Sequence, residues 1–225
     1  MYSTYQWNRS IPVNPIRTSA NIVKVSGKGT ISVQPNQASV IVGVVTEGVN
    51  LSSIQRENAE KMNNVIEALL QNGIQRGNIQ TNDYRIELNY DYKDGQQLFR
   101  GYRITNLIRV VIEDISHLGE FVDLAVENGA NIIRNIEMQV KEEQQFYNQA
   151  LTKAIEEATQ KAVTMGNTIG VNLNPIPIKI KEIIEQQERP RQVVLGLSTD
   201  STAVPTPIEP GLVDITAIVE MQFSY

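Results

Sequence analysis

The stretch Val25-Ser-Gly-Lys-Gly-Thr-Ile-Ser-Val33 (VSGKGTISV) decides between two classes of fold. Two glycines flank Lys28 and a hydroxyl residue follows, as in loops that bind phosphate at the start of a helix. However, valine, isoleucine and glycine hold the odd positions from Val23 to Val33, with no change of phase at the glycines. Such alternation is typical of a strand. We therefore expect Gly27 and Gly29 to lie on the buried face of one strand, where they leave room for a bend or for an element that crosses closely.

Working outward from this strand, residues 38–140 alternate between strand and helix patterns. The expected elements are, in order, a central strand at 38–46, a helix from Asn50 to Gly73, a strand at 79–92, a hairpin turn at Asp94-Gly95, a strand at 99–113, a helix capped by Ser116 and ended by Gly129, and a strand at 132–140. The order β-α-β-β-α-β is that of the split ferredoxin-like arrangement, with two helices on one face of an antiparallel sheet. The sequence therefore predicts an α+β fold with a ferredoxin-like core.

The rest of the chain adds an N-terminal arm and a C-terminal extension. Residues 1–20 offer little to bury and predict a flexible arm, which leaves one domain over 21–225. The extension comprises a long helix at 141–168, a strand at 176–184, a mobile Pro-rich loop at 185–210 and a strand at 212–223. The first strand and the two late strands either widen the core sheet or build a second small one. Alanines at every fourth position from Ala150 to Ala162 favour a helix that lies close on its own sheet over a seam between subunits.

Composition excludes several classes of protein. The 225 residues include no cysteine, which removes disulfides and thiolate chemistry, and the net charge of −5 argues against a broad nucleic-acid or anionic-membrane surface. No segment reaches the roughly 18 apolar residues of a membrane span. Residues 1–20 are polar and lack the apolar run of a signal peptide, so we expect a cytoplasmic location.

No group of residues has the pattern of a catalytic, cofactor-binding or metal-binding site. His117 is the only histidine, and Ser116 beside it is a helix-cap candidate without the motif of a catalytic serine. The adjacent pairs Glu142-Glu143 and Glu156-Glu157 do not share a helix face, and the first pair suits the positive N-terminal end of a helix. We accordingly predict no enzyme activity, no cofactor and no metal.

One segment resembles part of a nucleic-acid-binding motif. Arg100-Gly101-Tyr102-Arg103-Ile104 begins like an RNA-recognition signature, and it falls on the third strand of the β-α-β-β-α-β unit, where that signature belongs. The match then fails, because Arg103 stands where glycine or alanine is required and the first strand supplies no stacking aromatic residue. We therefore expect no nucleic-acid partner and interpret Tyr102 as a packed hairpin residue.

Aromatic residues gather near the expected hairpin. They are Tyr84, Tyr90, Tyr92, Phe99 and Tyr102. Such a cluster forms a ligand platform, cross-strand packing or a subunit interface. We favour a subunit interface, since aromatic side chains are enriched where proteins contact one another.

The chain also resembles a known protein family over about residues 21–225. The residues that carry the resemblance are, in chain order, Val25-Ser26-Gly27-x-Gly29, Pro35 followed by Ala38, Gly73-Ile74, Asn78-Ile79-Gln80-Thr81, Tyr90-x-Tyr92, Gly101-Tyr102, Asn106, Glu127-x-Gly129-Ala130-Asn131, Ala150-Leu151, Ala154, Ala158, Ala162 and Pro210-Gly211. This ordered set is similar to that of the SIMPL-domain family, named after a signalling molecule associated with a mouse pelle-like kinase. The family's bacterial members include a periplasmic immunogenic protein.

The resemblance implies an α/β domain without an established catalytic activity or an agreed set of catalytic residues. It further implies a capacity for assembly, because a bacterial member forms a large ring-like oligomer, and roles in the cell envelope or in oxidative stress. Many bacterial relatives carry a signal peptide, which we do not expect here.

Together these observations predict a non-enzymatic, self-assembling interaction protein that forms a homo-oligomer and offers a surface to a protein partner. Two alternatives stay open. One is a single-stranded nucleic-acid-binding module that uses the sheet face, and the other is a hydrolase whose site forms between subunits.

Overall fold

A computed structural model describes residues 21–184 and 206–225, so the arm expected at 1–20 and most of the loop expected at 185–210 lie outside the described residues. The elements are, in order, β1 (Ile22–Val33), β2 (Gln37–Gly48), α1 (Leu51–Gln71), η1 (Arg76–Asn78), β3 (Ile79–Lys93), β4 (Gln96–Ile112), η2 (Ile115–His117), α2 (Leu118–Glu127), β5 (Ile132–Gln139), α3 (Glu143–Ile169), β6 (Lys179–Ile183) and β7 (Val213–Ser224). All strand pairs are antiparallel, and the predicted α+β class is confirmed.

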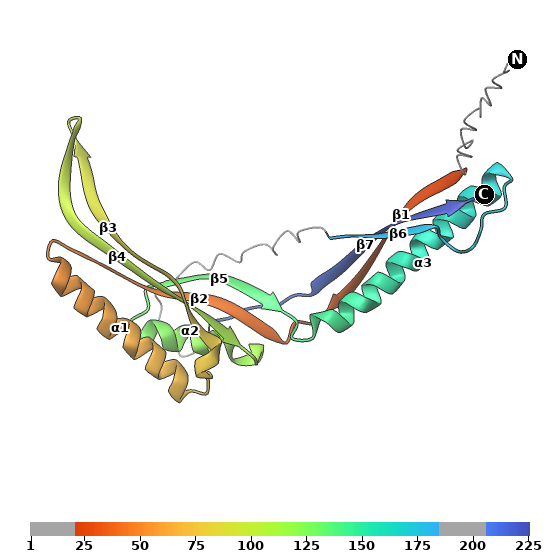
Figure 1. Cartoon of the computed structure of the whole chain (residues 1–225). Coiled ribbons are helices and arrows are strands. Elements are labelled where there is room, and N and C mark those ends of the chain that lie inside the picture. The colour runs from red at the N-terminus through yellow and green to blue at the C-terminus, as the bar shows by residue number, and fades with distance from the viewer. Residues whose placement is uncertain (1–20, 185–205) are drawn as a thin grey trace, which may run out of the picture.

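The predicted β-α-β-β-α-β unit forms a four-stranded sheet in the order β3-β4-β2-β5. β2 lies inside this sheet, which explains why residues 38–46 are apolar on both faces. α1 and α2 lie on one face of the sheet (Figure 1). Alternate residues of β2, from Ala38 to Val44, point into this layer and pack with Val65 and Leu69 of α1 and Val122 of α2 in one buried core. The ferredoxin-like core is therefore present.

The two core helices begin at different kinds of cap. The side-chain oxygen of Asn50 accepts a hydrogen bond from the backbone N–H of Ser53 at 3.0 Å, as predicted for the start of α1. The prediction that Ser116 caps the second helix is wrong. Asp114 instead caps the 3₁₀ turn η2, because its carboxylate accepts bonds from both the backbone N–H and the hydroxyl of Ser116, at 3.0 and 2.6 Å. α2 itself follows His117 and has no side-chain cap. The chain therefore enters the 3₁₀ turn η2 before α2 starts.

The first and last strands build a second sheet instead of widening the core sheet. β1 pairs with β7 from Ile22↔Ser224 to Val33↔Val213, and β6 pairs with the other side of β7, in the order β1-β7-β6. α3 lies along one face of this sheet (Figure 1). The alanines of α3 are buried against β1 and β7, so the alanine stripe is a contact between the helix and its own sheet, as predicted. The strand β1 runs through both of its glycines and is not a phosphate-binding loop.

Short polar contacts join the two sheets where the chain passes between them. The backbone N–H of Asn36 donates to the carbonyl of Gln139 at 3.1 Å, and the Asn36 side chain accepts from the N–H of Lys141 at 2.9 Å. Thr206 donates from its N–H and its hydroxyl to the Asp123 carboxylate of α2, at 2.9 and 2.5 Å. The segment that leads into β7 is therefore attached to the helical layer of the core sheet.

Two strands begin three residues away from the expected position, whereas the other strand boundaries agree within two residues. β6 begins at Lys179 instead of residue 176, since Pro177 has no N–H to give to a ladder. β4 begins at Gln96, three residues before the expected residue 99, and this earlier start lengthens the hairpin with β3.

Candidate functional site

The β3–β4 hairpin reaches beyond the rest of the core sheet and beyond α1 (Figure 1). β2 pairs with β4 only as far as Gly48↔Tyr102, whereas β3 follows β4 to Lys93↔Gln96 beside the turn. The turn residues Asp94 and Gly95 both have positive φ, 52° and 77°, as the predicted Asp-Gly hairpin requires. The far half of the hairpin is therefore a two-stranded ribbon.

One face of this ribbon carries a row of exposed apolar side chains. Strand pairing places Ile86 opposite Ile104 and Leu88 opposite Tyr102, on the same face that α1 and α2 cover further along β4. We call this row the hairpin stripe, and its members are Tyr84, Ile86, Leu88, Tyr90, Tyr92 and Phe99. Every member is at least 37% exposed, and Leu88 and Tyr92 reach 54% and 78%. Contiguous apolar surface of this kind marks sites of interaction with another molecule.

The structure brings three of the five predicted aromatic residues into contact. The ring of Phe99 lies edge-on to Tyr90, with centroids 5.8 Å apart, and edge-on to Tyr102, at 5.4 Å. Tyr84 and Tyr92 share the face but lie apart from this trio, opposite Asn106 and Gln97.

Sequence reasoning missed two members of the stripe. Ile86 and Leu88 lie between the tyrosines on β3. Their side chains are exposed to an extent similar to that of the tyrosine side chains. Their position in the same period-2 alternation was the signal that could have found them.

The opposite face of the hairpin is charged. A guanidinium nitrogen of Arg103 lies 2.5 Å from the carboxylate of Glu47, and Arg85 pairs with Asp83 at 2.7 Å. Arg100 forms a further ion pair with Asp91. The two faces therefore differ in chemistry: one is apolar and suited to contact, and the other carries ion pairs and one exposed leucine, Leu98 opposite Asp91.

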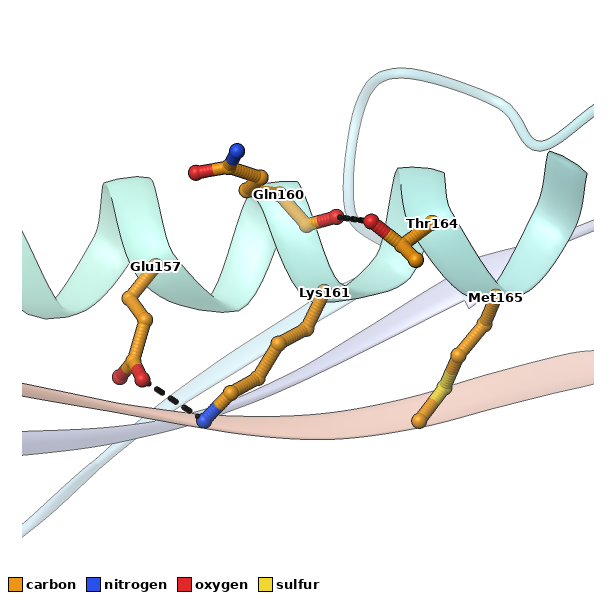
Figure 2. Close-up of a pocket in the computed structure, with 5 residues that line it drawn as sticks. All are labelled: Glu157, Gln160, Lys161, Thr164 and Met165. Atoms are coloured by element: carbon orange, nitrogen blue, oxygen red, sulfur yellow. Dashed lines mark hydrogen bonds and ion pairs between the residues drawn. The ribbon is translucent and has the colours of Figure 1, made fainter.

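A pocket on α3 is a second candidate site. Figure 2 shows its lining residues, Glu157, Gln160, Lys161, Thr164 and Met165. The Glu157 carboxylate accepts the backbone N–H of Lys28 in β1, and Lys161 donates to the carbonyl of Ser26 at 3.1 Å and pairs with Glu157 at 2.9 Å. The hydrogen bond from Lys28 and, next, the bond and charge of Lys161 hold the pKa of Glu157 below its ordinary value. The charged pair therefore satisfies backbone groups on the outer edge of β1 and is not poised as a catalytic acid.

His117 lies on the surface at the start of α2. Its Nδ1 atom is 2.9 Å from the Glu120 carboxylate, and this hydrogen bond, reinforced by the negative charge, raises the pKa of the imidazole. The hydroxyl of Ser116 donates to Asp114 and not to the imidazole. A Ser-His-Asp arrangement is therefore not formed.

Two negative findings apply to residues 21–184 and 206–225. In these residues, no group of three or more His, Cys, Asp or Glu side chains is placed to hold a metal ion. None of the helices described there combines the length and the apolar character that crossing a bilayer requires.

These features define an α+β protein with two helix-backed antiparallel sheets and one projecting hairpin. The family model SIMPL, described as "Protein of unknown function (DUF541)", matches residues 23–223. The chain belongs to this family, which confirms the resemblance seen in the sequence.

Two relatives illustrate what is known of similar proteins. The chain is 24% identical over 154 residues to the uncharacterized protein YggE of Escherichia coli (strain K12), and the alignment covers 68% of this chain. It spans 63% of that relative, slightly less than two thirds of its length. The chain is also 23% identical over 175 residues to the 26 kDa periplasmic immunogenic protein of Brucella melitensis, covering 76% of this chain and 70% of the relative. Neither name assigns an activity.

Proposed function

We propose that this protein is a non-enzymatic, self-assembling interaction protein whose contact surface is the hairpin stripe. The observation that carries the proposal is the row of exposed apolar side chains on a hairpin that extends past its covering helices. Burial of apolar surface is favourable by about 25 cal/mol per Å². A second copy of the chain is the simplest partner, because every copy presents the same row.

The hairpin geometry also bears on the nucleic-acid alternative. Tyr102 lies on the face of β4 that carries Ile108, Val110 and Ile112 into the helical core. A sheet that binds single strands presents its stacking aromatics on the open face instead. The position of Tyr102 therefore favours the self-assembly proposal. For the intersubunit hydrolase, His117 is the only histidine, and in the described residues its Nδ1 atom bonds Glu120 and no serine or threonine hydroxyl.

Size-exclusion chromatography with light scattering tests the proposal. The wild-type chain is expected to elute as an oligomer at micromolar concentration, and Leu88→Asp is expected to shift it to smaller species. The matched control is Val163→Asp on α3, because Val163 is 51% exposed and Leu88 is 54% exposed. A carboxylate at Val163 is expected to leave the assembly unchanged. A wild-type chain that stays monomeric at micromolar concentration would contradict the proposal.

The cellular location of the protein is also proposed. We propose a cytoplasmic location, whereas the name of the Brucella relative places that relative in the periplasm. Fractionation of cells that carry the full-length gene, followed by immunoblotting, distinguishes the two locations.

A further inference from the structure

We infer that two copies of this chain pair edge to edge through β3, antiparallel, about a twofold axis that passes midway between the two copies of Leu88. The inference rests on the proposed self-assembly and specifies its geometry. It follows from the position of β3 in its sheet, from the length of its regular segment and from the order of residues along it.

β3 has the longest open edge among the described strands. It is at the end of the sheet order β3-β4-β2-β5, and no other described strand pairs with its outer side. The other edges are less suitable: Glu157 and Lys161 occupy the outer edge of β1, and β6 has only 5 residues. β5 is interrupted at Asn135, whose φ is 53°. An unprotected edge strand is a template for pairing with another chain.

The regular segment of β3 is centred on Leu88. Its start is set by an extra residue, Asn82, between the pairs Thr81↔Ile108 and Asp83↔Leu107. Its end is set by the turn at 94–95. The irregularity beside Tyr90 adds its extra residue to β4 and leaves β3 itself regular from 83 to 93. The midpoint of 83–93 is residue 88, so a twofold axis there uses the whole segment.

Residue order supports the same centre. An antiparallel pair related by a twofold axis at Leu88 places Ile86 opposite Tyr90, Tyr84 opposite Tyr92, and Leu88 opposite its own copy. All members of the stripe on β3 then meet another member, on one face. On the other face, Arg85 comes opposite Asp91 and Glu87 opposite Asn89. Each polar pair therefore joins opposite charges or a charge and an amide.

Neighbouring registers lose this match. A centre at Glu87 places two copies of that carboxylate opposite each other and Asp83 opposite Asp91. A centre at Asn89 places Glu87 opposite Asp91. Like charges directly opposite in a sheet are destabilising.

Registers two residues away preserve the charge match but lose apolar pairs. A centre at Ile86 leaves Tyr90 and Tyr92 without apolar partners, and a centre at Tyr90 does the same to Tyr84 and Ile86. Leu88 is the only centre of these five that satisfies both faces.

In the resulting dimer, the two four-stranded sheets join into one continuous sheet, with α1 and α2 of both copies on the same side. On that side the β3 members of the two hairpin stripes contact each other across the new strand pair. The contact is isologous, so it closes on itself and leaves the second sheet of each copy free for further assembly.

Single-cysteine variants test this geometry without interference from native cysteines, because the chain contains none. Directly opposite residues of an antiparallel pair have Cα atoms about 4.5–5.5 Å apart, inside the range of a disulfide. Leu88→Cys is therefore expected to form mostly disulfide-linked dimers on a non-reducing gel in oxidised glutathione. Ile86→Cys is the matched control on the same face, 43% exposed. Its two copies would lie about 13 Å apart along the strands, so little linkage is expected.

A mixture of Ile86→Cys and Tyr90→Cys chains is expected to link, while neither variant links alone. Circular dichroism melts verify that each variant is folded. If the wild-type chain self-associates but Ile86→Cys links alone, or Leu88→Cys does not link, the β3 register is wrong while the proposed self-assembly stands. A wild-type chain that is monomeric by light scattering, with no linkage in any variant, overturns both.

Discussion

Gly27 of β1 lies against the backbone of Ala154 in α3: a Cβ atom on Gly27 would come within 2.0 Å of the Ala154 carbonyl oxygen. The relationship repeats four residues earlier on the helix, where a Cβ on Gly29 would come within 1.9 Å of the Ala150 carbonyl oxygen. The strand glycines and the helix alanines are therefore two halves of one contact. Because only small residues line it, the helix rests almost backbone to backbone on the sheet.

The first prediction concerns this contact. Gly27→Ala is expected to destabilise the protein by about 3 kcal/mol, because the new methyl group meets backbone atoms that cannot move independently of α3. Urea unfolding followed by circular dichroism measures the effect. The control is Gly77→Ala, since a Cβ there meets nothing within 4 Å, and its expected effect is below about 0.5 kcal/mol. Equal stabilities of the two variants would contradict the close contact.

Residue periodicity and turn signals were enough to predict most elements and their faces. The alternation through Gly27 and Gly29 predicted both the strand and the close crossing. Which sheet the first strand and the two late strands would join could not be predicted, because alternation defines the two faces of a strand and not its neighbour. β1 finds its partner β7 at the far end of the chain, with Ile22 opposite Ser224.

The candidate site was predicted in part for a related reason. The tyrosines of β3 could be assigned to one face from their spacing. Their exposure could not, because it depends on β2 ending its pairing at Gly48 while the hairpin continues. The cap at Asp114 was missed because Ser116 has an equally suitable side chain two residues later.

The second prediction concerns Asn58, a buried polar residue of α1 that the sequence did not single out. Its side-chain amide donates to the carbonyl of Val44 at 3.0 Å and to the Thr46 hydroxyl at 3.4 Å, and so joins α1 to β2. Asn58→Ala is expected to cost about 2 kcal/mol, because the buried Val44 and Thr46 oxygens lose a donor.

Thermal or urea unfolding measures this loss. Asn64→Ala is the control, since Asn64 is on the exposed side of the same helix. Its expected effect is neutral or slightly stabilising, because alanine is the better helix former. A loss of the same size at both positions would show that the amide of Asn58 contributes nothing specific.

The third prediction concerns the outer edge of β1. The backbone N–H of Lys28 donates to the Glu157 carboxylate. Glu157→Ala removes that acceptor, and the Lys28 amide is expected to exchange with solvent about tenfold faster, as the loss of one charged hydrogen bond implies. Hydrogen exchange followed by NMR measures the rate at this amide.

Glu156→Ala serves as the control, because Glu156 is exposed and adjacent on the helix. The exchange rate at Lys28 is expected to stay the same in that variant. Equal acceleration in both variants would indicate a general loosening of α3 and not the loss of one bond.

The fourth prediction concerns the pKa of His117, which lies above its ordinary value of 6.5. The main cause is the hydrogen bond between the imidazole and Glu120, and the second cause is the negative charge of Glu120. Since the folded pKa exceeds the unfolded one, the pair stabilises the fold below the unfolded pKa, and this stabilisation is lost as pH rises through the folded pKa. An NMR titration of the single imidazole is expected to show a fall in its pKa in Glu120→Gln. The fall should be smaller in Asp114→Asn, because Asp114 is the weakest contributor to the shift. The reverse order would show that Asp114, 3.8 Å from the ring, is the dominant partner.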